Sequence, residues 1–197
     1  MPVELDIPAD GTRPALLLRT WLLADMPGLV AEMTRAYPNR GLWTHPSVDV
    51  PGPQRWSGPR DEREAALWLA GQQHGWEAGD WLTFAVVDRS LSTAVGHVGL
   101  RNRDGGTVGT GERGEISYWT ASGARGRGIA PAAVRAVTDW AFGRFGQDGL
   151  PLIMLVHDVA NPASCRVAAK AGYPFRELSP ASPPRWYTDG HIHVARP

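Results

Sequence analysis

The feature that most constrains the fold is a change in hydrophobic periodicity near the middle of the chain. Three strand-length segments rich in β-branched and aromatic residues follow one another with short turns: WLTFAVVD (81–88), AVGHVGLRN (94–102) and GEISYWT (114–120). They predict an antiparallel meander. An amphipathic helix comes next, and then the apolar run LPLIMLVHDV (150–159), which is typical of a central strand. Because a helix lies between them, we expect 114–120 and 150–159 to pair in parallel.

The flanking segments predict further helices and strands. ALLLRTWLL (15–23) indicates a strand, and Asp25-Met26-Pro27 resembles an N-cap with proline in the first turn of a helix that runs to about residue 37. A second helix is expected over 61–77. A helix from Asn161 to Lys170, with Gly172 as C-cap, precedes a final hairpin that turns at Asp189-Gly190.

Together these elements predict an α+β fold. We expect one domain over residues 1–197, with a mixed, partly antiparallel sheet of about seven strands and about four helices. The segment 38–60 contains five prolines and three glycines without periodicity, and a loop of this length is usually functional or disordered.

The overall charge and the cysteine content exclude several classes of protein. Twenty basic and twenty acidic residues cancel, so no global field attracts the chain to nucleic acid or to an anionic membrane. Cys165 is the single cysteine, which excludes an intramolecular disulfide and fits a reducing compartment. No segment resembles an export signal or a membrane span, so we expect a cytoplasmic protein.

An arginine- and glycine-rich turn precedes the central helix, with the sequence Arg125-Gly126-Arg127-Gly128-Ile129-Ala130. A helix N-terminus presents unpaired N–H groups and a partial positive charge, and glycines allow a ligand to approach the backbone. The turn therefore suits a phosphate group. The alternative is a simple turn with solvated arginines. The turn is neither a dinucleotide-binding G-x-G-x-x-G motif nor a Walker loop.

Three motifs in order resemble the GNAT acyl-CoA-dependent N-acetyltransferases, and within them the RimJ/RimL-like branch. They are GEISYWTA (114–121), the R-x-x-G-x-A pattern of Arg125, Gly128 and Ala130, and N-x-x-S-x-x-V-x-x-K-A-G-Y over 161–173. The resemblance covers about residues 94–176, which would form the acetyl-CoA-binding core. Residues of about 22–80 would then form the acceptor side.

The resemblance implies the GNAT fold, acetyl-CoA as co-substrate and a set of cofactor-binding residues. In the family, the strands corresponding to 114–120 and 152–158 separate so that pantetheine inserts between them, and the turn at 125–130 binds the pyrophosphate. The implied binding residues are Trp119, Thr120, Arg125, Gly126, Arg127, Gly128, Ile129, Ala130, Asn161 and Ser164.

Two residues are candidates for catalysis. Glu115 occupies a strand position where many family members have a carboxylate, which would take a proton from the attacking amine; the alternative is a structural carboxylate. In the RimJ/RimL-like branch the serine at position 164 lies near the coenzyme sulfur, where it could protonate the departing thiolate. The alternative is that Asn161 and Ser164 only cap the helix. Many other GNAT enzymes use a tyrosine where this chain has Ala168.

We predict no metal site from the sequence. His191 and His193 lie two apart on an expected strand, but no third ligand is apparent. His157 is interpreted as an edge histidine and Cys165 as a small buried side chain without an activating partner.

The sequence therefore predicts direct transfer of an acetyl group from acetyl-CoA to a primary amine in a ternary complex. The acceptor is a protein or peptide N-terminus or a small amino compound, and the tryptophans near the loop suit an apolar or planar acceptor. A non-catalytic acyl-CoA sensor is the first alternative, and an RNA-binding protein, which the neutral charge disfavours, is the second. Whether the chain forms a homodimer stays open.

Overall fold

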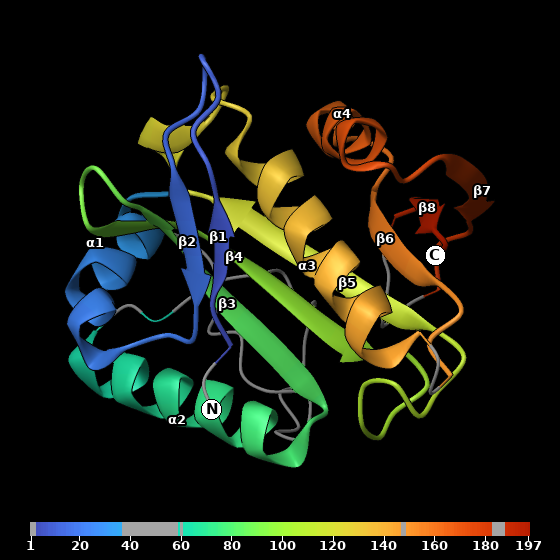
Figure 1. Ribbon diagram of the computed structural model, residues 1–197, viewed down its shortest axis with the longest axis horizontal. Coiled ribbons are helices and arrows are strands. Elements are labelled where there is room, and N and C mark those ends of the chain that lie inside the picture. The colour runs from blue at the N-terminus through green and yellow to red at the C-terminus, as the bar shows by residue number, and fades with distance from the viewer. Residues whose placement is uncertain (1–2, 37–58, 60, 147–148, 183–187) are drawn as a thin grey trace.

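The computed structural model describes residues 3–36, 59, 61–146, 149–182 and 188–197, and its strands form one sheet of eight in the order β1-β2-β3-β4-β5-β6-β8-β7 (Figure 1). In chain order the elements are β1 (Leu5–Ile7), β2 (Leu16–Arg19), α1 (Met26–Ala36), α2 (Glu62–Ala78), β3 (Trp81–Asp88), β4 (Thr93–Asn102), β5 (Gly114–Thr120), α3 (Ile129–Phe145), β6 (Ile153–Asp158), α4 (Pro162–Ala171), β7 (Phe175–Ser179) and β8 (Gly190–Ala195). Short 3-10 turns lie at Leu23–Asp25 (η1) and Ser122–Ala124 (η2).

The mixed α+β fold is confirmed. All neighbouring strands are antiparallel except β5 and β6, which pair in parallel as expected. The sheet has eight strands rather than about seven, because the three-residue β1 pairs with β2 and is too short to produce a recognisable pattern. The final hairpin is antiparallel, but the tight turn at Asp189-Gly190 is wrong. Gly190 already belongs to β8 and lies opposite Ser179.

The sheet is covered on both faces, as the burial along β3 requires. Every residue of β3 is buried. Leu82, Phe84 and Val86 pack with α3 and α4, whereas the alternate residues Ala85 and Val87 pack with α1 and α2. Figure 1 shows α3 lying across one face of the sheet. Among the helices of the described ranges, none has the length and apolar character to cross a membrane.

α1 begins at Met26 as predicted, but the Asp25 side chain has other partners than the expected ones. Asp25 does not cap α1 but ends η1, where its carboxylate pairs with Arg19 at 2.7 Å and accepts a hydrogen bond from the Leu22 N–H at 2.9 Å. The other predicted helix starts are close to those observed. Asp61 caps α2 by accepting from the Glu64 N–H at 2.7 Å. Of the proline-rich segment only Pro59 is described, so Trp43 and Trp56 lie outside the described residues.

Gly75 provides a test of the contact between α2 and the sheet. A Cβ added there would lie 2.7 Å from the Trp81 carbonyl oxygen, closer than packed atoms allow. At Gly143 of α3 an added Cβ would meet nothing within 4 Å. We expect Gly75→Ala to lower the free energy of unfolding by about 1–3 kcal/mol, since overpacking outweighs the gain in helix propensity. Gly143→Ala should raise it by about 0.5–1 kcal/mol.

Urea unfolding of the two variants beside the parent protein measures both changes. If Gly75→Ala is as stable as Gly143→Ala, the close packing of α2 on β3 is wrong.

Candidate active site

β5 and β6 separate after a short paired region. Only Gly114, Glu115 and Ile116 of β5 have partners in β6, and the last pair is Ile116 with Leu155. Beyond that pair β5 continues to Thr120 and β6 to Asp158 without pairing to each other. The sheet therefore opens at its centre, next to the N-termini of α3 and α4.

A cavity of about 500 Å³ lies at this opening. Its walls come from the end of β5, the turn and first residues of α3, and one side of α4. They include most of the predicted binding residues: Trp119, Thr120, Arg125, Gly126, Gly128, Ile129, Ala130, Asn161 and Ser164.

The turn before α3 leaves its backbone accessible to a ligand. Gly126 and Gly128 have φ of +78° and +72°, a region that side-chain-bearing residues rarely adopt, and an added Cβ at either would meet nothing within 4 Å. Gly128 is the N-cap of α3 and has no side chain with which to cap the helix. The first-turn N–H groups of α3 are thus left for an anionic ligand.

The two arginines of the turn differ in their contacts. Arg125 lines the cavity and donates from Nε to the Thr120 carbonyl oxygen at 3.2 Å. Arg127 is not among the lining residues, and its guanidinium lies 3.6 Å from the buried carboxylate of Asp88. Arg127 therefore fixes the turn to the end of β3.

Two cations of α4 line the cavity although the sequence analysis did not assign them to the site. Arg166 and Lys170 lie one helical turn apart, on the same stripe as Ala163 and Val167, which also line it. This i, i+3, i+4, i+7 spacing from Ala163 was the available signal. Together with Arg125 they give the cavity a positive rim, although the whole chain has no net charge.

Ser164 is held at the N-terminus of α4 by two contacts. Its N–H donates to Oδ1 of the N-cap Asn161 at 3.2 Å. Its Oγ accepts a hydrogen bond from the Tyr118 hydroxyl of β5 at 2.9 Å, across the opening between the strands. Asn161 and Ser164 thus form the helix cap and line the cavity at the same time.

Glu115 has a different environment. Its Oε1 lies 2.5 Å from Arg101 of β4, and its Oε2 forms an ion pair with Arg103. The side chain is 11% exposed and is not among the residues that line the cavity. This geometry favours the structural alternative, in which the carboxylate neutralises Arg101 of β4 and Arg103 of the turn that follows it.

A family model of the acetyltransferase (GNAT) domain matches residues 15–174. The chain belongs to the GNAT acetyltransferase family. This agrees with the fold and enzyme class that the three motifs predict. No sequence among the curated proteins is significantly similar to the chain.

Solved GNAT structures share the fold at low sequence identity. Mycobacterium smegmatis RimJ in complex with CoA-disulfide is 20% identical with a TM-score of 0.72, over 99% of this chain and 86% of RimJ. The ribosomal-protein-S5-alanine acetyltransferase of Vibrio fischeri is 18% identical with a TM-score of 0.72, over 98% and 96%. The microcin C7 self-immunity acetyltransferase MccE, in complex with acetyl-CoA and AMP, is 13% identical with a TM-score of 0.70, over 97% and 98%. These likenesses show the shared GNAT fold.

Tyr118 is a candidate site residue that the sequence analysis missed. The GNAT tyrosine expected in α4 is replaced by the fully buried Ala168, and Tyr118 brings a phenol to the same cavity from β5. Burial raises the pKa of Tyr118, so the phenol is neutral and acts as a hydrogen-bond donor. Its position within the motif GEISYWTA was visible, but its contact with Ser164 depends on the separation of β5 from β6.

The face of the sheet opposite α3 contains an aromatic cluster around a histidine. Trp21 stacks on His97 and contacts Trp68 and Trp119, and its Nε1 donates to His97 Nδ1 at 3.1 Å. His97 is fully buried, and burial lowers its pKa to about 3. The ring is therefore neutral and apolar in character at neutral pH.

A second histidine cluster contradicts two interpretations of the sequence. His191 and His193 do have further ligand-type neighbours, His157 and Cys165, and the four ligand atoms lie within 4.8 Å of one another. Cys165 is half-buried and has close imidazole partners rather than none. Burial lowers the pKa of His157 and of His193.

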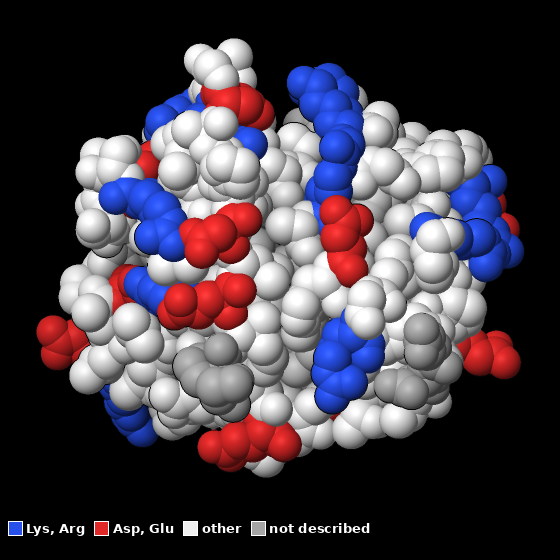
Figure 2. Space-filling model, in the orientation of Figure 1, with Lys and Arg blue, Asp and Glu red and all other residues white. Residues whose placement is uncertain are grey.

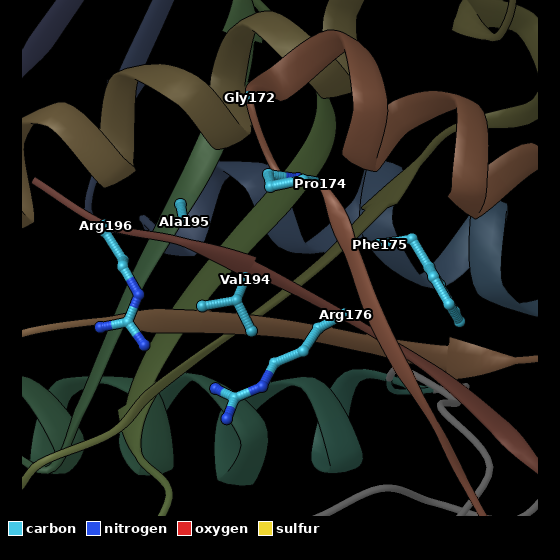
Figure 3. Close-up of a pocket in the computed structure, with 7 residues that line it drawn as sticks. All are labelled: Gly172, Pro174, Phe175, Arg176, Val194, Ala195 and Arg196. Atoms are coloured by element: carbon cyan, nitrogen blue, oxygen red, sulfur yellow. The ribbon is translucent and has the colours of Figure 1, made fainter.

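A second groove, of about 620 Å³, contains none of the predicted site residues. Figure 3 shows its walls on β7 and β8, where Arg176 and Arg196 flank Val194. The surface elsewhere is mixed in charge: Figure 2 shows acidic and basic side chains interspersed over the face that it presents. The cavity between β5 and β6 is thus the candidate active site, because the motif residues and the N-termini of α3 and α4 meet there.

The neutral state of His97 makes stability depend on pH. In the unfolded chain the ring has its ordinary pKa of about 6.5, so at acid pH the unfolded state binds a proton that the folded state does not. The contribution of the neutral His97 ring to the free energy of unfolding is complete above about pH 6.5 and is lost as the pH falls towards 3. Between about pH 7.5 and pH 5, we expect the native protein to lose about 2 kcal/mol more unfolding free energy than His97→Gln.

Urea unfolding at the two pH values measures this difference, with the exposed His74→Gln as control. Equal pH dependence of the native protein and His97→Gln would contradict a neutral buried His97.

Proposed function

We propose that the protein is an acetyl-CoA-dependent N-acetyltransferase that joins the acetyl group directly to a primary amine. The observation that carries this proposal is the cavity at the separation of β5 from β6. The N-terminus of α3, which has no side-chain cap, and Ser164 both line it. Acetyl-CoA supplies the activated acetyl thioester, and coenzyme A leaves as a thiol.

The residues present fit the cofactor. The first-turn N–H groups of α3 and the open backbone at Gly126 and Gly128 suit a pyrophosphate. Arg125, Arg166 and Lys170 surround that position and would pair with phosphate oxygens. The unpaired edges of β5 beyond Ile116 and of β6 beyond Leu155 provide backbone groups for the amides of pantetheine.

We assign the protonation of the departing thiolate to Ser164. Because the Tyr118 hydroxyl donates to Ser164 Oγ, the serine can direct its own hydrogen into the cavity. When the carbon–sulfur bond breaks, this hydrogen passes to sulfur, and Tyr118 replaces it on Ser164 before solvent restores the phenol. Tyr118 is thus a positioning residue that also relays a proton.

We assign removal of the amine proton to water. Each Glu115 oxygen is engaged by a guanidinium group, and the side chain is not among the residues that line the cavity. A water molecule at the open end of the cavity can accept the amine proton without first breaking an ion pair.

The acceptor is a primary amine, and we favour the α-amine of a peptide. The named acceptor of the Vibrio fischeri structure is a ribosomal protein, whereas MccE is a self-immunity enzyme against microcin C7. On this chain Trp119 of β5 lines the cavity, and its indole would favour an apolar first side chain in the acceptor.

A mixed acceptor panel tests the function. The purified protein is incubated with acetyl-CoA and with peptides, free amino acids, aminoglycosides and other amino compounds, and acetylation is read as a mass increase with release of free thiol. Acetylation of peptide N-termini is the expected result. Modification of a small molecule alone would replace the proposed acceptor, and tight acetyl-CoA binding without turnover on any member would favour the sensor alternative.

Two substitutions of Gly128, by asparagine and by aspartate, test the phosphate-binding turn with side chains of nearly equal volume. Asparagine and aspartate both tolerate a positive φ, but only aspartate places a negative charge at the N-terminus of α3. We expect Gly128→Asp to weaken acetyl-CoA binding at least about 10-fold more than Gly128→Asn does. Isothermal calorimetry measures both affinities, and equal affinities would exclude the turn as the pyrophosphate site.

Ser164 and Glu115 are expected to differ in their kinetic effects. Ser164→Ala should lower kcat about 100-fold with little change in acetyl-CoA affinity, since general-acid catalysis is typically worth at least that factor. Glu115→Gln should keep the shape of the pH–rate profile and mainly lower thermal stability. Loss of the acid limb of the pH–rate profile in Glu115→Gln, or an unchanged kcat in Ser164→Ala, would reverse these two assignments.

A further inference from the structure

Four side chains with metal-binding atoms converge between the sheet and α4. His157 of β6 lies directly opposite His191 of β8 in the register, and His193 lies two residues further along β8. These three imidazoles therefore share one face of the sheet. Cys165 of α4 contacts them there, and the four ligand atoms lie within 4.8 Å of one another.

Three of the six distances between these atoms are close to those of a tetrahedral site. His157 Nε2 lies 3.2 Å from His193 Nε2. Cys165 Sγ lies 3.4 Å from His157 Nε2 and 3.2 Å from His191 Nδ1. Ordinary zinc–nitrogen and zinc–sulfur bonds in a tetrahedron separate two nitrogens by about 3.4 Å and a sulfur from a nitrogen by about 3.5 Å. These three distances are close to those values, and since all four ligand atoms lie within 4.8 Å of one another, the cluster can close around a metal ion with shifts of about 1 Å.

The outer nitrogens of two imidazoles fix where their protons lie. His157 Nδ1 is 2.8 Å from the Asp158 carbonyl oxygen, and His193 Nδ1 is 3.2 Å from the Tyr173 carbonyl oxygen. A carbonyl oxygen only accepts hydrogen bonds, so each Nδ1 carries the hydrogen. In the neutral rings each Nε2 then has no hydrogen and carries a lone pair.

Two lone pairs that face each other at 3.2 Å need a cation between them. A shared proton would place a positive charge on His157 or His193, whose exposed fractions are only 7% and 4%. Burial of that charge is unfavourable because no carboxylate takes part in the cluster. A metal ion is bound by all four groups at once, and Cys165 as thiolate offsets one of its charges.

We propose that His157, Cys165, His191 and His193 bind one zinc ion. Three imidazoles and a thiolate suit zinc and exclude the hard cations, which prefer oxygen ligands. Binding displaces the thiol proton of Cys165 to solvent. The Asp158 and Tyr173 carbonyls orient two of the ligands, as acceptors on metal-bound histidines commonly do.

Four protein ligands leave no open coordination position, so the site is structural rather than catalytic. Phe175 of β7 covers it, with its ring centroid 5.3 Å from that of His191 and 5.7 Å from that of His193. Figure 3 shows Phe175 and Arg176 leaving β7 in different directions, so the arginine of the neighbouring groove does not share this contact. The zinc would join β6, β8 and α4, immediately beside Ser164.

Metal content and cobalt substitution test the site on the full chain without a histidine tag. When the protein is expressed with added zinc, elemental mass spectrometry should find about one zinc ion per chain. After removal of zinc with a chelator, one equivalent of cobalt(II) should give the intense visible bands of tetrahedral coordination and a near-ultraviolet thiolate-to-cobalt band. Zinc should also raise the Tm of the chelated protein.

Cys165→Ala should lose the thiolate band and bind zinc at least about 100-fold more weakly, because changes outside the ligand shell alone cost about 10- to 100-fold. The exposed His74→Ala is the control for histidine removal and should behave as the native protein. If Cys165→Ala is unstable, His191→Ala provides the second test, with the same expected loss of affinity. Substoichiometric zinc, octahedral cobalt spectra or unchanged affinity in both ligand variants would overturn the proposal.

Discussion

Three residue pairs, from Gly114–Ile153 to Ile116–Leu155, hold β5 against β6, and beyond them the two strands part. The remaining neighbours stay fully paired, so the opening is confined to the centre of one continuous sheet. A parallel pair requires a crossover helix, and α3 is that helix. Its N-terminus lies where β5 ends, and therefore next to the opening. The separation of these strands thus explains the cavity, the available backbone groups and the approach of an uncapped helix end.

Much of this arrangement could be predicted because it depends on local chemistry. The strands at 81–88 and 114–120 agree residue for residue with β3 and β5, since alternating or continuous apolar segments between turns leave few other structures. Asn161-Pro162 and Gly172 marked the ends of α4 through cap and C-cap chemistry. The turn at 125–130 was recognisable because two glycines with positive φ are needed there.

What could not be predicted depends on which side chains meet across strands. The Asp25 carboxylate suited a helix cap, but Arg19 of the preceding strand competes for it at 2.7 Å. Arg127 was indistinguishable from Arg125 in sequence, and only the buried Asp88 at 3.6 Å separates their roles. Glu115 fitted a catalytic position by resemblance, but two arginines of β4 and the turn after it engage it. In each case an ion pair with a residue of another segment favours one of two alternatives that local sequence left equal.

The histidine cluster shows the same limit, and it also changes the interpretation of α4. His157, Cys165, His191 and His193 are spread over 37 positions in the chain, and they meet only because β8 inserts between β6 and β7. Consecutive residues of α4 then serve different purposes: Ser164 contacts Tyr118 across the cavity, and Cys165 contacts imidazoles of β6 and β8. Any force that fixes Cys165 also fixes the direction of Ser164 Oγ, since both lie in the first turn of one helix. The position of the hydroxyl in the candidate active site thus depends on contacts on the far side of α4, outside the GNAT motifs that identify the family.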